Sequence, residues 1–316
     1  MEGDGNIRLS LWILIQVACL ITLAAPLAVL GADDDASGVA AIVSNRIRPY
    51  ADALGGVRDV LDKNGGIPLK EYWLNDYPDE ERSSLGEALA GKPSMTILTI
   101  GPEALVFAQT LKGVETRPIV YTVVLSPERL ISTSGIICGV SLNIPVSSQL
   151  SDITKVLPDI RRLGLLFDPA HNREFLEAAG KSAMNLGVSI VPLPVTSKTQ
   201  IPEILEKNLS GLDGVWMIPD KTVISERIVQ YIIRETITQK KPVIGYNRFF
   251  YESGAVASFE FDYRELGIQA GECLLSWFGT GECPSPEPRY KRLINTKVAE
   301  KINIRISGSV SGGEVR

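Results

Sequence analysis

The sequence predicts an α/β fold in which two doubly wound parallel-sheet lobes are joined by a three-strand hinge. Short apolar runs rich in β-branched residues alternate with amphipathic stretches of helical length, which is typical of parallel sheets covered by helices. This alternation occurs in both halves of the chain. The length of 316 residues exceeds what a single hydrophobic core normally holds, so two lobes are expected.

The strands and helices can be placed approximately. The expected strands cover residues 39–44, 69–75, 95–100 and 118–123 in the first half, and 162–167, 188–193, 214–218, 242–246 and 255–259 in the second. Gly101-Pro102-Glu103 opens a helix, because proline at the first position loses only an amide without a partner and Glu103 complements the helix dipole. A glycine, Gly187, is expected to end a helix over 173–186. Asp262 is expected to cap one over 263–278.

Three segments are expected to cross between the lobes. Residues 135–145 are extended and apolar without helical periodicity, as in a crossover strand. The helix after Asp262 follows the second set of strands and should return to the first lobe, and residues 289–295 should cross once more. The domains are then expected as follows: lobe 1, residues 38–142 plus 263–289; lobe 2, residues 143–262 plus 290–306; and a Ser/Gly-rich disordered tail, 307–316.

The N-terminus has the pattern of an export signal. Residues 9–30 are largely apolar and are followed by Gly31, Ala32 and three aspartates, so we expect a cleavable signal peptide over 1–31 and a periplasmic or otherwise extracytoplasmic protein. The alternative is a retained N-terminal membrane anchor, because the apolar stretch is long enough to span a bilayer.

Three cysteines remain after that leader. Cys273 and Cys283 flank a Gly-rich turn and could form a disulfide in an oxidising compartment. The alternative is that they are buried thiols, since lone cysteines often behave as small apolar residues. Cys138 lies in an apolar run and is expected in the core.

Composition and motifs argue against several function classes. The formal net charge of −5 does not suit a nucleic-acid partner, which requires a concentrated basic surface. The single histidine, His171, is expected at an exposed position in the opening turn of a helix. The sequence contains no nucleophile elbow, phosphate loop, dinucleotide glycine fingerprint or metal-ligand spacing. We therefore expect no enzyme, no cofactor and no metal.

A ligand site is expected where the carboxyl ends of parallel strands and the N-termini of helices meet at one edge of each sheet. The candidate residues from the two halves, expected to face one gap, are Ser44, Asn45, Tyr50, Gly101, Glu103, Thr122, Asp168, Asp220, Tyr246 and Asn247. A ligand carboxylate is expected against the amides near Gly101 and the hydroxyl of Ser44 or Thr122. An amino group would suit Asp168 or Asp220.

Aromatic side chains and simpler structural roles complete this interpretation. Tyr50, Tyr246 and Phe249 could sandwich a flat or apolar part of the ligand. Alternatively, Ser44, Asn45 and Thr122 close turns or cap helices, and the Asp168 carboxyl shapes a loop before proline. Asp220 could likewise form a solvated pair with Lys221.

Nine segments in order resemble a known family. They are PYADALGGVRDVL, ILTIGPEAL, RPIVYTVVLSP, GVSLNIP, VLPDIRRLGLLFDP, DGVWMIPDKTV, KPVIGYN, GAVASFEFDYRELGIQAG and LINTKVAEKINI. Together they resemble the ABC transporter substrate-binding protein family with a type I periplasmic-binding fold, whose members include binders of tryptophan and other aromatic amino acids. The resemblance extends from residue 39 to about residue 304. It implies a monomer that closes on a small ligand and presents it to ABC permease subunits in the membrane.

The chain departs from that family in two places, and one rival function stays open. Gly101-Pro102 stands where the family usually has Gly-Thr, and Asp168-Pro169 where it often has Asn-Pro. The identity of the ligand is therefore left open. A ligand sensor that signals to a membrane receptor or kinase would use the same cleft. A transcription regulator of the same fold would need a helix-turn-helix where this chain has its leader.

Overall fold

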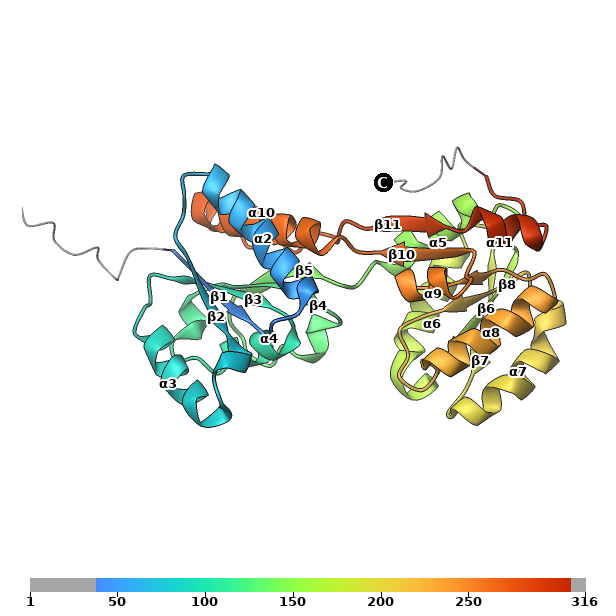
Figure 1. The fold of residues 1–316 in the computed structure, drawn as a ribbon, viewed down its shortest axis with the longest axis horizontal. Coiled ribbons are helices and arrows are strands. Elements are labelled where there is room, and N and C mark those ends of the chain that lie inside the picture. The colour runs from blue at the N-terminus through green and yellow to red at the C-terminus, as the bar shows by residue number, and fades with distance from the viewer. Residues whose placement is uncertain (1–37, 308–316) are drawn as a thin grey trace, which may run out of the picture. The chain divides into compact units, whose positions relative to one another are not determined.

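The computed structural model of the protein describes residues 38–307. These residues form two β-sheets, and helices cover both faces of each sheet (Figure 1). The predicted α/β class with two doubly wound sheets is therefore confirmed. The predicted signal peptide and residues 308–316 of the predicted tail lie outside the described residues.

The first sheet has five parallel strands in the order β2-β1-β3-β4-β5. Its elements are β1 (Val39–Val43), α2 (Arg48–Lys63), β2 (Leu69–Trp73), α3 (Asp79–Ala90), β3 (Thr96–Ile100), α4 (Pro102–Ala108), β4 (Ile119–Val124) and β5 (Ile137–Ser141), with short 3₁₀ turns η1 (Leu74–Asp76), η2 (Val114–Thr116) and η3 (Pro127–Arg129). One more helix of this half, α10 (Tyr263–Thr280), comes from much later in the chain. Because side chains alternate along a strand, Val39 and Ala41 face α2 and α10, whereas Ala40 and Ile42 face α3 and α4.

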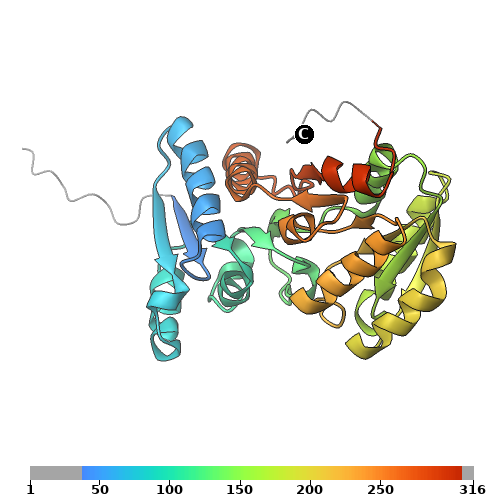
Figure 2. The same ribbon diagram turned by 45° about the vertical axis from the view of Figure 1, so that its right-hand side comes forward.

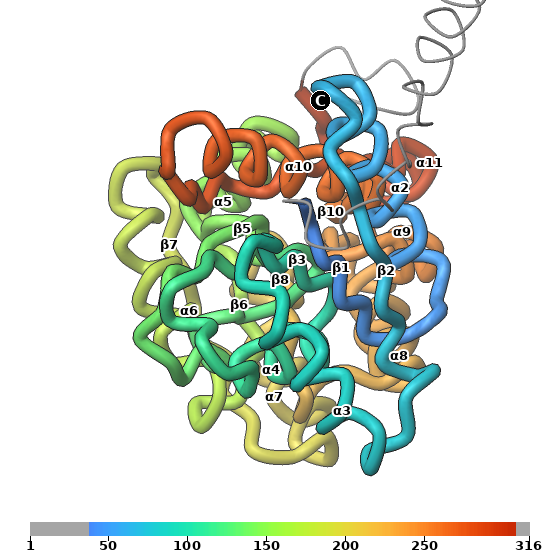
Figure 3. Tube along the Cα trace, turned by 90° about the vertical axis from the view of Figure 1, so that its left-hand side faces the viewer, coloured from blue at the N-terminus to red at the C-terminus, as the bar shows by residue number. Residues whose placement is uncertain are grey.

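The return of α10 to the first half, predicted from the sequence, is confirmed by its packing. Leu266, Ala270 and Leu274 lie in the same buried cluster as β1, β3 and β4. Helix α10 runs beside α2, as Figures 1 and 3 show. The two helices touch through backbone: a Cβ atom added at Gly267 would lie 1.9 Å from the Ala53 carbonyl oxygen. Glycine is required there because any side chain would separate the helices.

The second sheet has six strands in the order β11-β10-β9-β8-β6-β7. Its elements are α5 (Val146–Val156), β6 (Arg162–Phe167), α6 (Pro169–Ala183), β7 (Ser189–Pro194), η4 (Lys198–Gln200), α7 (Ile201–Asn208), η5 (Leu209–Gly211), β8 (Gly214–Met217), α8 (Glu226–Thr238), β9 (Val243–Ile244), α9 (Arg248–Glu252), β10 (Ala257–Glu260), β11 (Lys291–Ile294) and α11 (Thr296–Lys301). The strands are parallel except β11, which pairs antiparallel with β10 at the edge. The sequence pattern did not predict this reversal.

Helices lie on both faces of the second sheet. Helices α7 and α8 pack on one face, where Leu166 and Met217 point, and Figure 2 shows these yellow and orange helices together. Helices α5, α6 and α11 pack on the other face, where Leu165 and Trp216 point. The alternation of neighbouring residues between two apolar clusters explains why these strands are hydrophobic throughout.

The ends of several strands and helices differ from those predicted. The expected crossover strand over 135–145 divides into β5, which pairs with β4, and residues 142–145, which leave the first sheet. The helix expected over 173–186 begins earlier, at Pro169, and Asn172 has non-helical backbone angles inside it. Gly187 adopts the predicted left-handed conformation, with φ of +67°, but α6 has already ended at Ala183. Ser307, the first residue of the predicted tail, donates its amide to the Val156 carbonyl over 3.1 Å.

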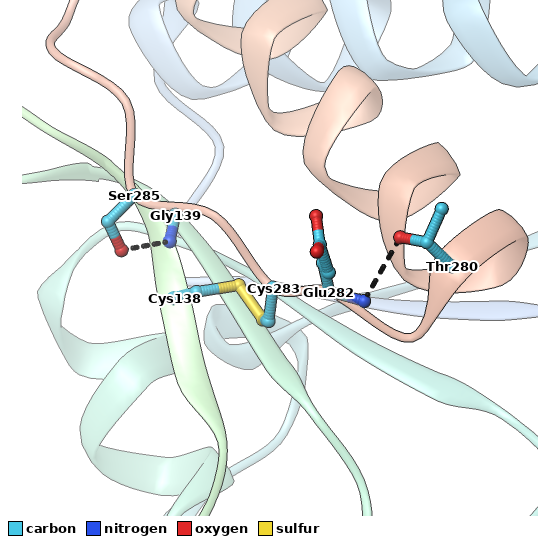
Figure 4. Close-up of a disulfide and its surroundings, with 6 residues drawn as sticks. All are labelled: Cys138, Gly139, Thr280, Glu282, Cys283 and Ser285. Carbon is cyan, nitrogen blue, oxygen red and sulfur yellow. Dashed lines mark hydrogen bonds between the residues drawn. A yellow bond between two sulfur atoms is a disulfide. The ribbon is translucent and has the colours of Figure 1, made fainter.

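The possible disulfide between Cys273 and Cys283 is wrong in its partner, and the alternative of buried thiols holds for Cys273. Cys283 is bonded to Cys138 on β5, with the two Cα atoms 5.5 Å apart, whereas Cys273 is a buried free thiol. Cys138 does lie in the core, as predicted. The reason is geometric: Cys273 points into the core between α10 and the sheet, while Cys283 follows the left-handed Gly281 that ends α10 and is turned back over β5 (Figure 4).

Candidate functional site

The carboxyl edge of the first sheet brings Ser44, Tyr50 and Gly101 together. Ser44 follows β1, is buried, and its hydroxyl oxygen accepts the Ala104 amide of α4 over 3.0 Å. Gly101 has a φ of +92°, and a Cβ atom there would lie 2.5 Å from Ser44 Oγ and 2.8 Å from Tyr50 Cζ. Pro102 has no amide and the Ala104 amide is already bonded, so the start of α4 offers little for the expected ligand carboxylate.

Glu103 and Asn45 lie beside this cluster. Glu103 is exposed, and its charge, together with burial as the larger cause, raises the pKa of the Tyr50 phenol. The Asn45 Oδ1 atom is buried without a hydrogen-bond partner in the described chain. An unpaired buried carbonyl is costly, so Asn45 is able to accept a donor from outside the protein.

Thr122 lies at the same edge but is fully buried, and its hydroxyl donates over 3.4 Å to the Leu266 carbonyl of α10. The next residue, Val123, has a φ of +57°, and the register of β4 with β5 shifts between Thr122 and Val124. A β-branched residue in the left-handed region is strained, so this bulge is held by the packing around it. The bulge at Val123 could not be predicted from the sequence.

Asp168 and Asp220 are brought together at the carboxyl edge of the second sheet. The Asp168 amide donates to Asp220 Oδ2 over 2.7 Å. Asp220 also accepts the Asn172 side-chain amide at 2.8 Å and the backbone amides of Thr222 and Val223 at 2.9 and 3.2 Å. Asp220 is only 2% exposed and its four acceptor positions are filled, which excludes a solvated pair with Lys221.

Asp168 keeps spare acceptor capacity. Its Oδ1 accepts the Ala170 amide at the start of α6 over 2.9 Å, and its Oδ2 accepts the Thr222 hydroxyl over 2.7 Å. These two hydrogen bonds lower the pKa of the Asp168 carboxyl, the Thr222 bond being the larger cause. Each oxygen has a second lone pair, so an ionised Asp168 could still accept a ligand donor. His171 lies exposed in the first turn of α6, as predicted.

Tyr246 and Asn247 follow β9 and begin α9. The Tyr246 ring packs against Phe250 with centroids 4.8 Å apart, and burial raises the pKa of Tyr246 to about 12. Asn247 is the N-cap of α9, and its Oδ1 accepts the Phe250 amide at a long 3.4 Å. Gly245 allows this arrangement, because a Cβ atom there would lie 2.1 Å from Phe250 Cβ. Asn247 therefore has a capping role that the sequence did not indicate.

A cavity of about 400 Å³ has lining residues from both halves. Its lining residues are Arg48, Pro49 and Asp52 of α2, Arg248 of α9, and Glu260, Phe261, Asp262, Tyr263 and Lys291 of the crossing segments. Tyr50 follows Pro49 in the chain, and Asn247 precedes Arg248. None of the ten predicted site residues is itself among the lining residues, and only Tyr50 and Asn247 are next to a lining residue in the chain.

The charged residues of this cavity, which the candidate site did not include, are arranged in pairs. The Arg248 guanidinium donates two hydrogen bonds to the Glu260 carboxylate, one from Nε and one from Nη2, the second over 2.9 Å. Lys291 lies 3.5 Å from Asp262, whose other oxygen caps α10, and Arg48 lies 3.5 Å from Asp52. Glu260, Asp262 and Lys291 could have been found from the sequence, because they lie at the helix start predicted at Asp262 or in the crossing predicted over 289–295.

A second cavity, of about 290 Å³, lies at the opposite edge of the second sheet. It is lined by residues that precede strands, among them Ile160, Asp213 and Pro242. The carboxyl ends of strands, not these amino ends, are where parallel α/β sheets bind ligands.

Two findings concern the described residues alone. Among residues 38–307, no group of three or more His, Cys, Asp and Glu side chains is arranged to hold a metal ion. No helix in that range combines the length and the apolar character needed to cross a membrane.

Comparison with known proteins identifies the family. A family model described as ABC transporter substrate binding protein matches residues 90–313. The chain belongs to this family. Its members are substrate-binding proteins and not a class of enzyme, so the ligand-binding role expected from the sequence is supported, and members are typically extracytoplasmic.

The relatives and solved structures agree with this. A tyrosine-binding protein of Clostridioides difficile is 20% identical over 207 residues, which are 63% of this chain and 58% of that protein. A ligand-free, open substrate-binding protein with adhesive properties from Clostridium difficile has a TM-score of 0.72 at 16% identity, covering 87% of this chain and 97% of that one. A Streptococcus pneumonia ABC domain in complex with L-Trp has a TM-score of 0.53 at 18% identity, with coverages of 86% and 97%. At these identities the structures show the fold alone.

Proposed function

We propose that the protein is the exported solute-binding component of an ABC importer and that it holds a zwitterionic amino acid between its two halves. The observation that carries this proposal is the cavity bounded by α2, α9 and the crossing segments. Its volume of about 400 Å³ falls inside the range of roughly 300–1,000 Å³ that small-molecule sites occupy.

The chemistry of the wall suits a ligand that carries both charges. Arg48, Arg248 and Lys291 supply three cations, and each already lies near a carboxylate. A zwitterion can insert into such pairs without leaving a net charge uncompensated. The Tyr50 ring, next in the chain to Pro49 of the cavity wall, and the Tyr246 ring, two positions before Arg248, would pack against an apolar or aromatic side chain. The tyrosine-binding relative and the L-Trp complex support an aromatic amino acid.

The proposed mechanism is closure of the two halves. A ligand stabilises a closed state only through contacts that it makes to both halves at once. Exposed or half-buried candidates on each side, Asn45 and Glu103 in the first half and Tyr246 and Asn247 in the second, would make these contacts. The buried Ser44, Thr122 and Asp220 would hold the framework. The closed form would then deliver the ligand to permease subunits in the membrane.

Export is part of the proposal. The Cys138–Cys283 disulfide supports it, because disulfides persist in oxidising compartments outside the cytoplasm. The predicted signal peptide would direct the chain there.

Thermal-shift screening followed by calorimetry tests the ligand class. Aromatic amino acids should raise the melting temperature in proportion to their affinity, while nucleosides and sugars should not. Binding of a sugar or nucleoside instead would disprove the assignment, as would a failure of all twenty amino acids to bind.

Asn247→Ala tests the site. It should weaken binding by about 1–3 kcal/mol, the usual effect of removing a buried polar contact, which is roughly a 5- to 150-fold rise in Kd. Asn295→Ala is the matched control, because Asn295 caps α11 in the same way, accepting the Val298 amide over 3.1 Å, away from the cavity. Equal effects of the two substitutions on Kd would show that Asn247 acts only as a cap.

A further inference from the structure

The third crossing between the halves runs from the end of α10 to β11, and its part over residues 283–289 is called here the return segment. It begins after Gly281, which ends α10 in the left-handed conformation with φ of +73°. The return segment is fastened to β5 at two neighbouring points (Figure 4). Cys283 is disulfide-bonded to Cys138, and the Ser285 hydroxyl oxygen accepts the Gly139 amide over 3.3 Å.

A buried glutamine fastens the same segment to α10. Gln269 is 3% exposed, and its side chain donates to the Glu287 carbonyl over 2.9 Å and accepts the Arg289 amide over 2.8 Å. One side-chain amide thus pairs with two backbone groups of an otherwise irregular segment, as a neighbouring strand would. The Arg289 guanidinium adds ion pairs with Glu265 and Glu272 of α10.

At the next residue, Tyr290, the side-chain contacts change from the first half to the second. The Tyr290 hydroxyl donates to Asp152 of α5 over 2.8 Å, and its ring packs edge-to-face on Phe259 with centroids 5.6 Å apart. Arg292 binds the other oxygen of Asp152 at 3.2 Å. The chain therefore passes from the first half to the second across the single peptide bond between Arg289 and Tyr290.

The other two crossings change partners just as sharply. In the first, Asn143 accepts the Ser126 amide of the first half over 3.0 Å, and the following Ile144 is buried in the core of the second. In the second crossing, Phe261 packs against the cores of both halves. Rotation at 143–144, 261 and 289–290 would leave each core intact.

We propose that Gln269 and the Cys138–Cys283 disulfide are positioning residues for ligand closure, because they hold the return segment to the first half and confine its bending to the bond between Arg289 and Tyr290. The inference rests on the proposed ligand-binding function. Without these ties, residues 283–289 would bend along their length, and the halves would sample more arrangements that cannot close on a ligand. The apparent affinity falls in proportion to the loss of the competent population. The Ser148 hydroxyl of α5 also donates to the Glu287 carboxylate over 3.3 Å, so this contact joins the return segment to the second half and would change on rotation at Arg289–Tyr290.

Two variants test the proposal: Gln269→Leu, and the double substitution Cys138→Ser with Cys283→Ser. The control is Gln109→Leu, which removes a similar set of glutamine hydrogen bonds in the first half. Gln109 bonds Leu105, Leu130 and Ser132, none of which belongs to the crossing points at 143–144, 261 and 289–290. The first measurement is hydrogen exchange of the Arg289 amide. The second is the distribution of distances, without ligand, between dyes attached to unnatural amino acids at positions 63 and 184. The third is the Kd of the amino acid that binds most tightly.

Both test variants should exchange the Arg289 amide faster, broaden the distance distribution and bind roughly 3- to 10-fold more weakly, while the control changes none of these. Faster exchange with an unchanged distance distribution and Kd overturns the proposal. If the cysteine variant does not fold, Gln269→Leu alone decides. If wild-type protein binds no amino acid, the proposed function fails, but the distance distribution still tests the positioning role.

Discussion

Replacing Gly267 with alanine tests the packing that joins α10 to the first half. The added Cβ atom would lie 1.9 Å from the Ala53 carbonyl oxygen, about 1.5 Å closer than ordinary van der Waals contact. A backbone carbonyl in the middle of α2 cannot rotate away, so the two helices must separate. Overpacking of this kind costs about 1–3 kcal/mol, and the upper part of that range applies because the neighbour is rigid.

Alanine also favours the helix by about 1 kcal/mol relative to glycine, so the net loss expected for Gly267→Ala is about 2 kcal/mol. For a chain of this size, that lowers the melting temperature by roughly 3–4 °C. Gly279→Ala is the matched control on the same helix, because a Cβ atom there meets nothing within 4 Å. It should keep the gain in helix propensity, up to about 1 kcal/mol, and raise the melting temperature slightly.

Thermal unfolding of the wild type and both variants, followed by circular dichroism, measures the difference. The reasoning predicts shifts of opposite sign from two identical substitutions in one helix. If Gly267→Ala melts at or above the wild-type temperature, together with Gly279→Ala, then α2 and α10 are not in the close contact described.

Three further predictions concern buried groups. Burial raises the pKa of the Cys273 thiol to about 11. Iodoacetamide at pH 8 should therefore modify Cys273 only after unfolding. Rapid reaction of the native protein would contradict this. Because hydrogen bonds lower the pKa of Asp168 in the folded state, its contribution to stability is present above the ordinary carboxyl pKa and is lost as the pH falls through the lowered value. Thr222→Val should raise that pKa in an NMR titration, and an unchanged pKa would exclude the hydroxyl as its cause. Asp220→Ala should reduce the free energy of unfolding by about 2–4 kcal/mol in urea denaturation, since several donors lose their acceptor, whereas the exposed Lys221→Ala should have no measurable effect.

Most of the strands and helices were accessible from the sequence, because buried parallel strands are apolar throughout and are separated by helices. The cap at Asp262 was predicted for a local reason, and its carboxylate does accept the Arg264 and Glu265 amides. The return of α10 could be predicted from chain order alone. Features of this kind depend on a few adjacent residues or on the succession of elements.

The features that the sequence did not reveal depend on contacts between distant segments. The partner of Cys283 lies 145 residues away, and pairing followed the fold of the return segment over β5, not proximity in the chain. The strained Val123 and the antiparallel β11 are likewise set by neighbouring strands. The interlocked carboxyls of Asp168 and Asp220 lie 52 residues apart, which is why the sequence suggested two separate ligand groups where the structure has one network.

The late position of α10 in the chain has a consequence for biosynthesis. The five strands of the first sheet are complete at Ser141, yet the face that α2 and α10 cover together lacks α10 until residue 280 has been made. An apolar face left open in this way keeps the nascent chain from reaching a stable tertiary structure early. If the protein is exported as proposed, this delay would help to keep the chain unfolded until it has been threaded through the translocon.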